Sequence, residues 1–153
     1  MGDYLRTTRE CSLDSMRLEL AAAIRDRIKK YDLTDIERST SFCCETISTR
    51  QKKRLFRRKP EVVQTGILRT PRWLIWATGK ENESPGVLAA KLGDIRMQDN
   101  EKSNMYRMIQ DTGLNISGLH TGTANLGSAF IPLGSEPAAQ RFRDLLKGAK
   151  AEA

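Results

Sequence analysis

The side chains best suited to catalysis or zinc binding are few in this chain of 153 residues. There are three cysteines, Cys11, Cys43 and Cys44, and His120 is the only histidine. A nucleophilic cysteine or serine needs a base within hydrogen-bonding distance, and His120 is the only conventional base. Neither Cys-x-x-Cys nor Gly-x-Ser-x-Gly occurs, and acidic residues are mostly scattered singly. We therefore expect no catalytic residues, no metal site and no cofactor. The alternative is a catalytic pair of His120 with Cys43 or Cys44.

The cysteines favour a reducing environment. Their number is odd, and the first residues lack the apolar stretch of a secretory signal, so a disulfide framework is not expected. Cys43 and Cys44 cannot readily bridge to each other, because such a bond distorts the peptide between them. We expect all three to pack as small apolar groups in a cytoplasmic protein. A redox role for Cys43 and Cys44 is left open.

Positive charge is concentrated in one stretch of ten residues. The chain has 26 Lys and Arg against 19 Asp and Glu, a formal net charge of +7 at pH 7. Residues 50–59 contain seven basic and no acidic residues, so the rest of the chain has no net charge. A local run of this kind attracts phosphate groups or acidic protein surfaces, or it is a solvated loop without a partner. The candidate binding residues are Lys52, Lys53, Arg54, Arg57, Arg58 and Lys59.

Residues 12–31 have the periodicity of an amphipathic helix, with apolar residues at steps of three and four. The apolar positions are Leu13, Met16, Leu20, Ile24, Ile28 and Tyr31. Ser12 is the predicted N-cap. A helix of this type packs on its own domain or on a second copy of the chain, so a homo-oligomer formed through it is one expectation. We assign residues 1–40 to an N-terminal helical extension.

Seven short strands, separated by polar turns, are predicted after this extension. Their ranges are 41–49, 61–69, 72–78, 87–92, 95–98, 113–120 and 126–133. A closing helix is predicted over 136–147, with Ser135 as its N-cap and Gly148 as its stop. The predicted class is α+β, mainly β, with an antiparallel sheet that closes into a barrel or a sandwich.

This order of seven strands and one capping helix resembles the pleckstrin-homology-like barrel. The residues that carry the resemblance are 70–78 (TPRWLIWAT), 128–134 (SAFIPLG) and 136–142 (EPAAQRF). The chain from residue 41 resembles small bacterial PH-like or GRAM-like proteins, and we assign residues 41–150 to a PH-like domain. Phe142 stands where eukaryotic members usually have a tryptophan.

The resemblance places the basic run in the loop between the first two strands of the barrel. In phosphoinositide-binding members this loop holds the headgroup, and the next strand adds a basic pair. Here that strand offers Glu61 and Gln64, so we expect weak attraction to an anionic surface instead of a specific headgroup pocket. The predicted function is a non-enzymatic binding module, cytoplasmic and peripheral to the membrane, that binds anionic lipid or an acidic protein through residues 50–60. The alternative is a nucleic-acid-binding protein using the same loop, although Phe56 is the only aromatic residue within it.

Overall fold

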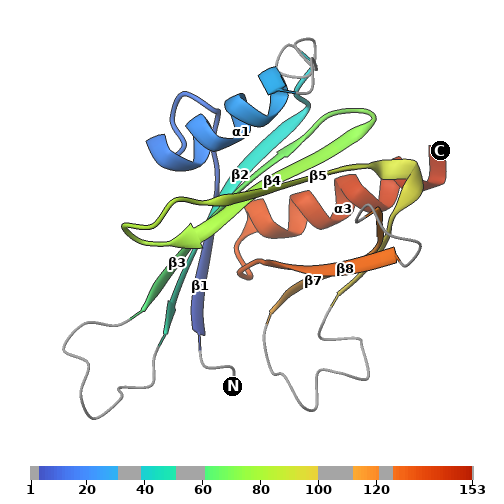
Figure 1. Ribbon diagram of the computed structural model, residues 1–153. Coiled ribbons are helices and arrows are strands. Elements are labelled where there is room, and N and C mark those ends of the chain that lie inside the picture. The colour runs from blue at the N-terminus through green and yellow to red at the C-terminus, as the bar shows by residue number, and fades with distance from the viewer. Residues whose placement is uncertain (1–3, 31–38, 51–60, 100–111, 121–125, 153) are drawn as a thin grey trace.

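The computed structural model describes residues 4–30, 39–50, 61–99, 112–120 and 126–152, which form two antiparallel sheets and two long helices (Figure 1). The five-stranded sheet consists, in spatial order, of β1 (Tyr4–Glu10), β2 (Phe42–Arg50), β3 (Val62–Arg69), β4 (Trp73–Lys80) and β5 (Gly86–Lys91). The three-stranded sheet consists of β6 (Arg96–Asp99), β7 (Gly113–His120) and β8 (Leu126–Pro132). Helix α1 spans Leu18–Lys30, helix α3 spans Pro137–Glu152, and the short 3-10 helix η1 (Leu92–Asp94) joins the two sheets.

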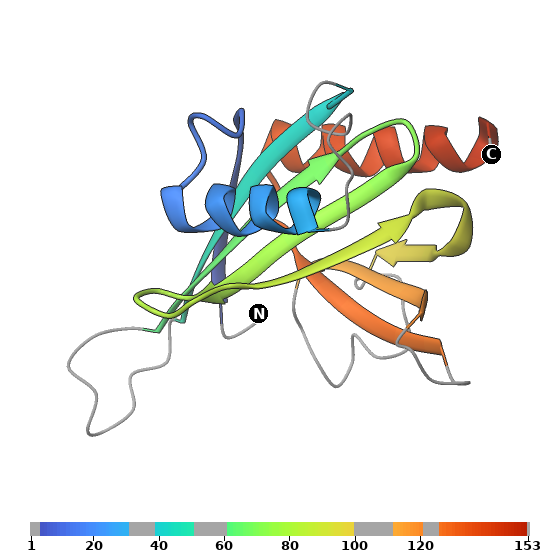
Figure 2. The ribbon, with the colours of Figure 1, turned by 45° about the horizontal axis from the view of Figure 1, so that its top comes forward.

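The five-stranded sheet is covered on both faces. Helix α1 lies across one face, and the three-stranded sheet together with α3 lies against the other (Figures 1 and 2). Strands in this position need apolar side chains on both faces of the sheet. They therefore lack the alternation of apolar and polar residues that is typical of a half-exposed strand. In β4 the four consecutive residues from Leu74 to Ala77 are all buried.

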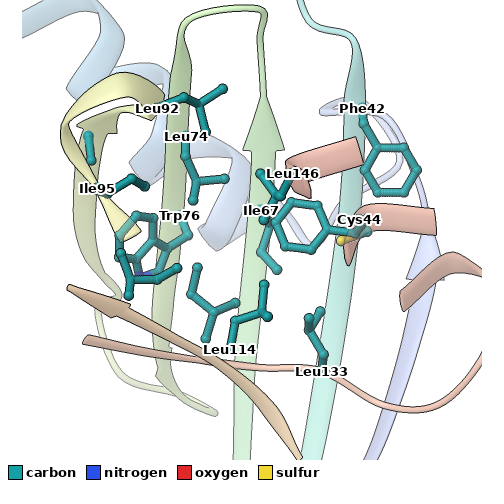
Figure 3. Close-up of a cluster of buried hydrophobic side chains, with 14 of the residues drawn as sticks. Phe42, Cys44, Ile67, Leu74, Trp76, Leu92, Ile95, Leu114, Leu133 and Leu146 are labelled. Carbon is teal, nitrogen blue, oxygen red and sulfur yellow. The ribbon is translucent and has the colours of Figure 1, made fainter. Parts of the chain in front are cut away.

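The larger core lies between the two sheets and α3 (Figure 3). Trp76 of β4 is 1% exposed and packs in the same cluster as Leu114 of β7. Phe142 of α3 is fully buried, and its ring stacks on that of Phe42 with 6.0 Å between the centroids. Burying aromatic side chains of this size provides much of the hydrophobic stabilisation, so this core holds the second sheet and α3 in place.

The smaller core lies between α1 and the opposite face of the sheet. Leu20, Ile24 and Ile28 of the helix are buried against residues of β2, β3 and β4. The helix comes close to the sheet at Gly66 of β3, where an added Cβ would lie 2.5 Å from Sδ of Met16. A glycine at this position therefore lets the start of the helical segment sit directly on the strand.

A buried carboxylate fixes the beginning of α1. Glu45 of β2 is 3% exposed, and its Oε2 accepts the backbone N–H of Arg17 at 2.7 Å. Its Oε1 accepts a hydrogen bond from the Arg9 guanidinium at 3.1 Å. The carbonyl of Arg17 accepts the N–H of Ala21, so Arg17 is the N-cap residue. The prediction that the helix starts at Ser12 is therefore wrong, because Ser12 instead exchanges hydrogen bonds with Ser15 in a preceding turn.

A second polar junction joins β1 to the start of α3. The Thr8 hydroxyl lies 2.8 Å from that of Thr46 and accepts the backbone N–H of Gly134 at 2.9 Å. The Thr8 N–H donates to the Glu136 carboxylate at 3.0 Å. The Glu136 carbonyl accepts the first helical hydrogen bonds of α3, so Glu136 and not Ser135 is its N-cap residue.

The mainly β class, the antiparallel pairing and the C-terminal helix are confirmed. The prediction of a seven-stranded barrel or sandwich is corrected in two respects. The described residues contain eight strands, because residues 4–10, within the segment predicted to be helical, form β1. No strand pairing joins the two sheets of the described residues, which therefore form two separate sheets and not a closed barrel. Helix α3 also continues past Gly148, the predicted stop, to Glu152.

We expect Glu45→Ala to lower the free energy of unfolding by about 1–3 kcal/mol, because two donors lose a buried charged acceptor. Urea denaturation at neutral pH measures this change. The control is Asp26→Ala, which removes an exposed carboxylate from α1 itself and is expected to change stability by less than about 0.5 kcal/mol. Equal effects of the two variants would contradict the role assigned to Glu45.

Candidate functional site

The basic run begins and ends at one end of the five-stranded sheet. β2 ends there at Arg50, and its backbone N–H donates to the carbonyl of Glu61 at 2.8 Å. Thr49 and Val62 then face each other in the ladder between β2 and β3. The six candidate cations, Lys52, Lys53, Arg54, Arg57, Arg58 and Lys59, lie outside the described residues. The structure therefore describes the stem of the predicted binding loop.

At this stem, Glu61 forms ion pairs with a basic residue of β2 and a basic residue of β4. Its carboxylate lies 3.4 Å from Nη1 of Arg50 and 3.4 Å from Nζ of Lys80. Partial burial alone would raise the pKa of Glu61, but hydrogen bonding and attraction by Lys80, and then by Arg50, bring it below its ordinary value. Here its charge stabilises the stem.

The β4–β5 turn lies at the same end of the sheet and carries acidic residues. The ladder pairs Lys80 with Val63, so the turn of residues 81–85 emerges beside the stem. A hollow of about 500 Å³ separates this turn from the start of α1. Its walls include charges of both signs: Arg17, Glu19, Lys80, Glu81 and Glu83. Mixed charge of this kind does not select an anion or a cation.

The thiols have different surroundings. Cys44 is fully buried in the larger core, and this burial raises the pKa of its thiol, so Cys44 stays protonated. Cys43 faces α1 and lies 3.8 Å, between Sγ atoms, from Cys11. His120 is the last residue of β7, and its side chain is outside what the structure describes. Because β7 lies against the face of the sheet opposite to α1, the position of Cys43 on the α1 face argues against a catalytic pair with His120.

Neither tryptophan of β4 offers an open surface for stacking a nucleic-acid base. Trp76 belongs to the larger core. Trp73 is partly buried against the α1 cluster, and Nζ of Lys91 lies 5.8 Å from its ring centroid. Single-strand binding commonly depends on exposed aromatic rings, so these two residues supply no such platform.

The sequence predictions missed the contact between Cys11 and Cys43 because they missed β1. The spacing of Thr7, Arg9 and Cys11, which share one side of an extended segment, was the only hint of this strand and is too weak to predict it. Among the described residues, no three His, Cys, Asp or Glu side chains are grouped as a metal ion would require. No helix in the described ranges is both long and apolar enough to span a membrane.

Comparison of the chain with known protein families, with curated proteins and with solved structures finds no match.

We expect Glu61→Gln to destabilise the protein at neutral pH, because Arg50 and Lys80 lose a shared anion. A carboxylate whose pKa is lowered in the folded state stabilises it at pH values above its unfolded pKa. The difference between the two proteins should therefore shrink as the pH falls through the lowered pKa of Glu61, and then vanish. Urea midpoints measured from neutral to acidic pH check this. A difference that persists unchanged in acid would contradict an ionic role.

Proposed function

We propose that this protein is a non-enzymatic binding module that attaches weakly to an anionic membrane surface through its basic β2–β3 connection. The observation that carries the proposal is the location of the charge. Seven of the ten residues from Arg50 to Lys59 are basic, and the connection starts and ends on two hydrogen-bonded strands. A sheet covered on both faces is a rigid base for such a connection.

Electrostatic attraction alone accounts for weak binding. A Lys or Arg near an anionic bilayer contributes about 1 kcal/mol, and screening by salt reduces this contribution. Several such residues in one connection are therefore enough for reversible attachment. The PH-like resemblance supports this use of the loop, and Glu61 at the stem favours charge attraction over a specific headgroup pocket. The protein would be cytoplasmic and peripheral to the membrane.

Two other partners would use the same charges. An acidic protein surface offers carboxylates in place of lipid phosphates, and nucleic acid offers a phosphate backbone. The burial of Trp76 and the packing of Trp73 make base stacking by these residues unfavourable, so we place nucleic acid second. A second copy of the chain, the third partner expected from the sequence, is less favoured because the apolar face of α1 already packs on its own sheet.

We expect the protein to co-sediment with vesicles containing phosphatidylserine and not with neutral phosphatidylcholine vesicles at low ionic strength. Lys52→Glu, Lys53→Glu, Arg57→Glu and Arg58→Glu, combined in one variant, should abolish this binding. Raising the salt concentration should weaken the binding of the unmodified protein, because the attraction is electrostatic.

The matched control reverses four exposed cations elsewhere, Lys29, Arg72, Lys91 and Arg96, and has the same net charge. This control should keep more of the vesicle binding than the loop variant. Equal loss in both variants would show that only net charge matters and would contradict the proposal. Binding to an oligonucleotide in a gel shift, with no binding to vesicles, would favour nucleic acid instead.

A further inference from the structure

Cys11 and Cys43 form a pair of thiols across two antiparallel strands. Cys11 directly follows β1, and its backbone N–H donates to the carbonyl of Cys43 at 3.0 Å. The pairing of Glu10 with Cys44 continues to this position, so the two side chains are cross-strand neighbours. Their Sγ atoms are 3.8 Å apart. A disulfide needs about 2 Å between the sulfurs, which a small rotation of side chains at the end of a strand can provide.

The two thiols differ in accessibility. Cys11 is half-buried and lines a surface hollow of about 340 Å³, whereas Cys43 is 4% exposed. The hollow is also bordered by Glu10, Asp14 and Arg25, and the guanidinium of Arg25 is paired with Asp14 at 2.8 Å. Cys43 also lines this hollow, and Cys11 is the more exposed of the two thiols, so a small oxidant in the hollow meets Cys11 first.

The electrostatic surroundings favour Cys11 as the thiolate. A hydrogen bond from Cys43 lowers the pKa of Cys11, and Arg9 lowers it further, whereas partial burial and the carboxylates of Glu45 and Glu10 oppose this. The same hydrogen bond, together with burial, raises the pKa of Cys43. When Cys11 is the thiolate, it has no proton to donate, so the S–H of Cys43 is the donor across the 3.8 Å between the two sulfurs. Because the thiolate is the reactive form, Cys11 is the better nucleophile.

We propose that Cys11 is an oxidant-reactive thiol that forms a reversible intramolecular disulfide with Cys43. The Cys11 thiolate attacks a hydroperoxide, an S–O bond forms, the O–O bond breaks, and the alkoxide leaves and takes a proton to become the alcohol. The Cys43 sulfur then attacks the sulfenic acid of Cys11. The S–S bond forms as the S–O bond breaks, and the departing hydroxide takes the Cys43 proton to become water. The two cysteines lose two electrons, and the hydroperoxide gains them.

The bond would enclose the segment that contains α1. Residues 12–42 would form a loop closed at the sheet, so the oxidised protein would hold the helix by a covalent link in addition to its packing. Cys44 points into the opposite core, and its raised pKa excludes it from the exchange. This inference is independent of the proposed membrane attachment.

The test treats the folded, reduced protein with hydrogen peroxide and maps its peptides by mass spectrometry. The expected product is a Cys11–Cys43 cross-link with the loss of two hydrogen atoms, which dithiothreitol reverses. Cys44→Ser should give the same product. Cys11→Ser should slow thiol loss by about tenfold or more. In Cys43→Ala, dimedone should trap the sulfenic acid of Cys11.

A second readout does not depend on Cys43→Ala folding. Iodoacetamide labelling of the unmodified protein across a pH series should modify Cys11 first, with a midpoint below that of an ordinary thiol. A cross-link through Cys44, a disulfide between two chains, or thiol loss in Cys11→Ser at the original rate would overturn the proposal. Labelling of Cys43 or Cys44 before Cys11 would also overturn it.

Discussion

The burial of both faces of one sheet determines the rest of this structure. With α1 on one side and the second sheet and α3 on the other, the central strands have no exposed face, so polar groups on them must find partners within the protein. Glu45 meets this requirement by accepting hydrogen bonds from Arg9 and from the start of α1. A buried carboxylate without such donors would be strongly destabilising. The helix and the charge therefore stabilise each other.

The central strands could be predicted from sequence because their composition is unambiguous. β4 is an apolar run bounded by a proline and a polar turn, and it lies within two residues of its expected range. β1 could not be predicted, because it exposes an apolar side chain and buries a polar one, the reverse of the usual pattern. Leu5 is 58% exposed, whereas Thr8 is 3% exposed and pairs with Thr46 and with the segment that begins α3. The pattern of an edge strand depends on partners that are distant in sequence.

The same distinction applies to the candidate sites. The basic run is a property of composition and is visible without a fold. The ion pairs that anchor its stem are not visible in the sequence, because Glu61 meets Arg50 and Lys80 only when β2, β3 and β4 are in register. The thiol pair is also a product of register, since residues 11 and 43 are neighbours only after β1 has been placed beside β2. The start of α1 was mispredicted for a related reason: the carboxylate that accepts the N–H of the N-cap residue Arg17 belongs to Glu45 of β2.

The junction of Thr8 with Glu136 spans 128 positions along the chain. Residue 8 is synthesised long before residue 136, so during translation the amide and hydroxyl of Thr8 lack their later hydrogen-bond partners. Contacts between such distant positions are slow to close. Among the described strands, β1 is thus one of the last to gain its full set of hydrogen bonds, because its partners at the start of α3 are synthesised later.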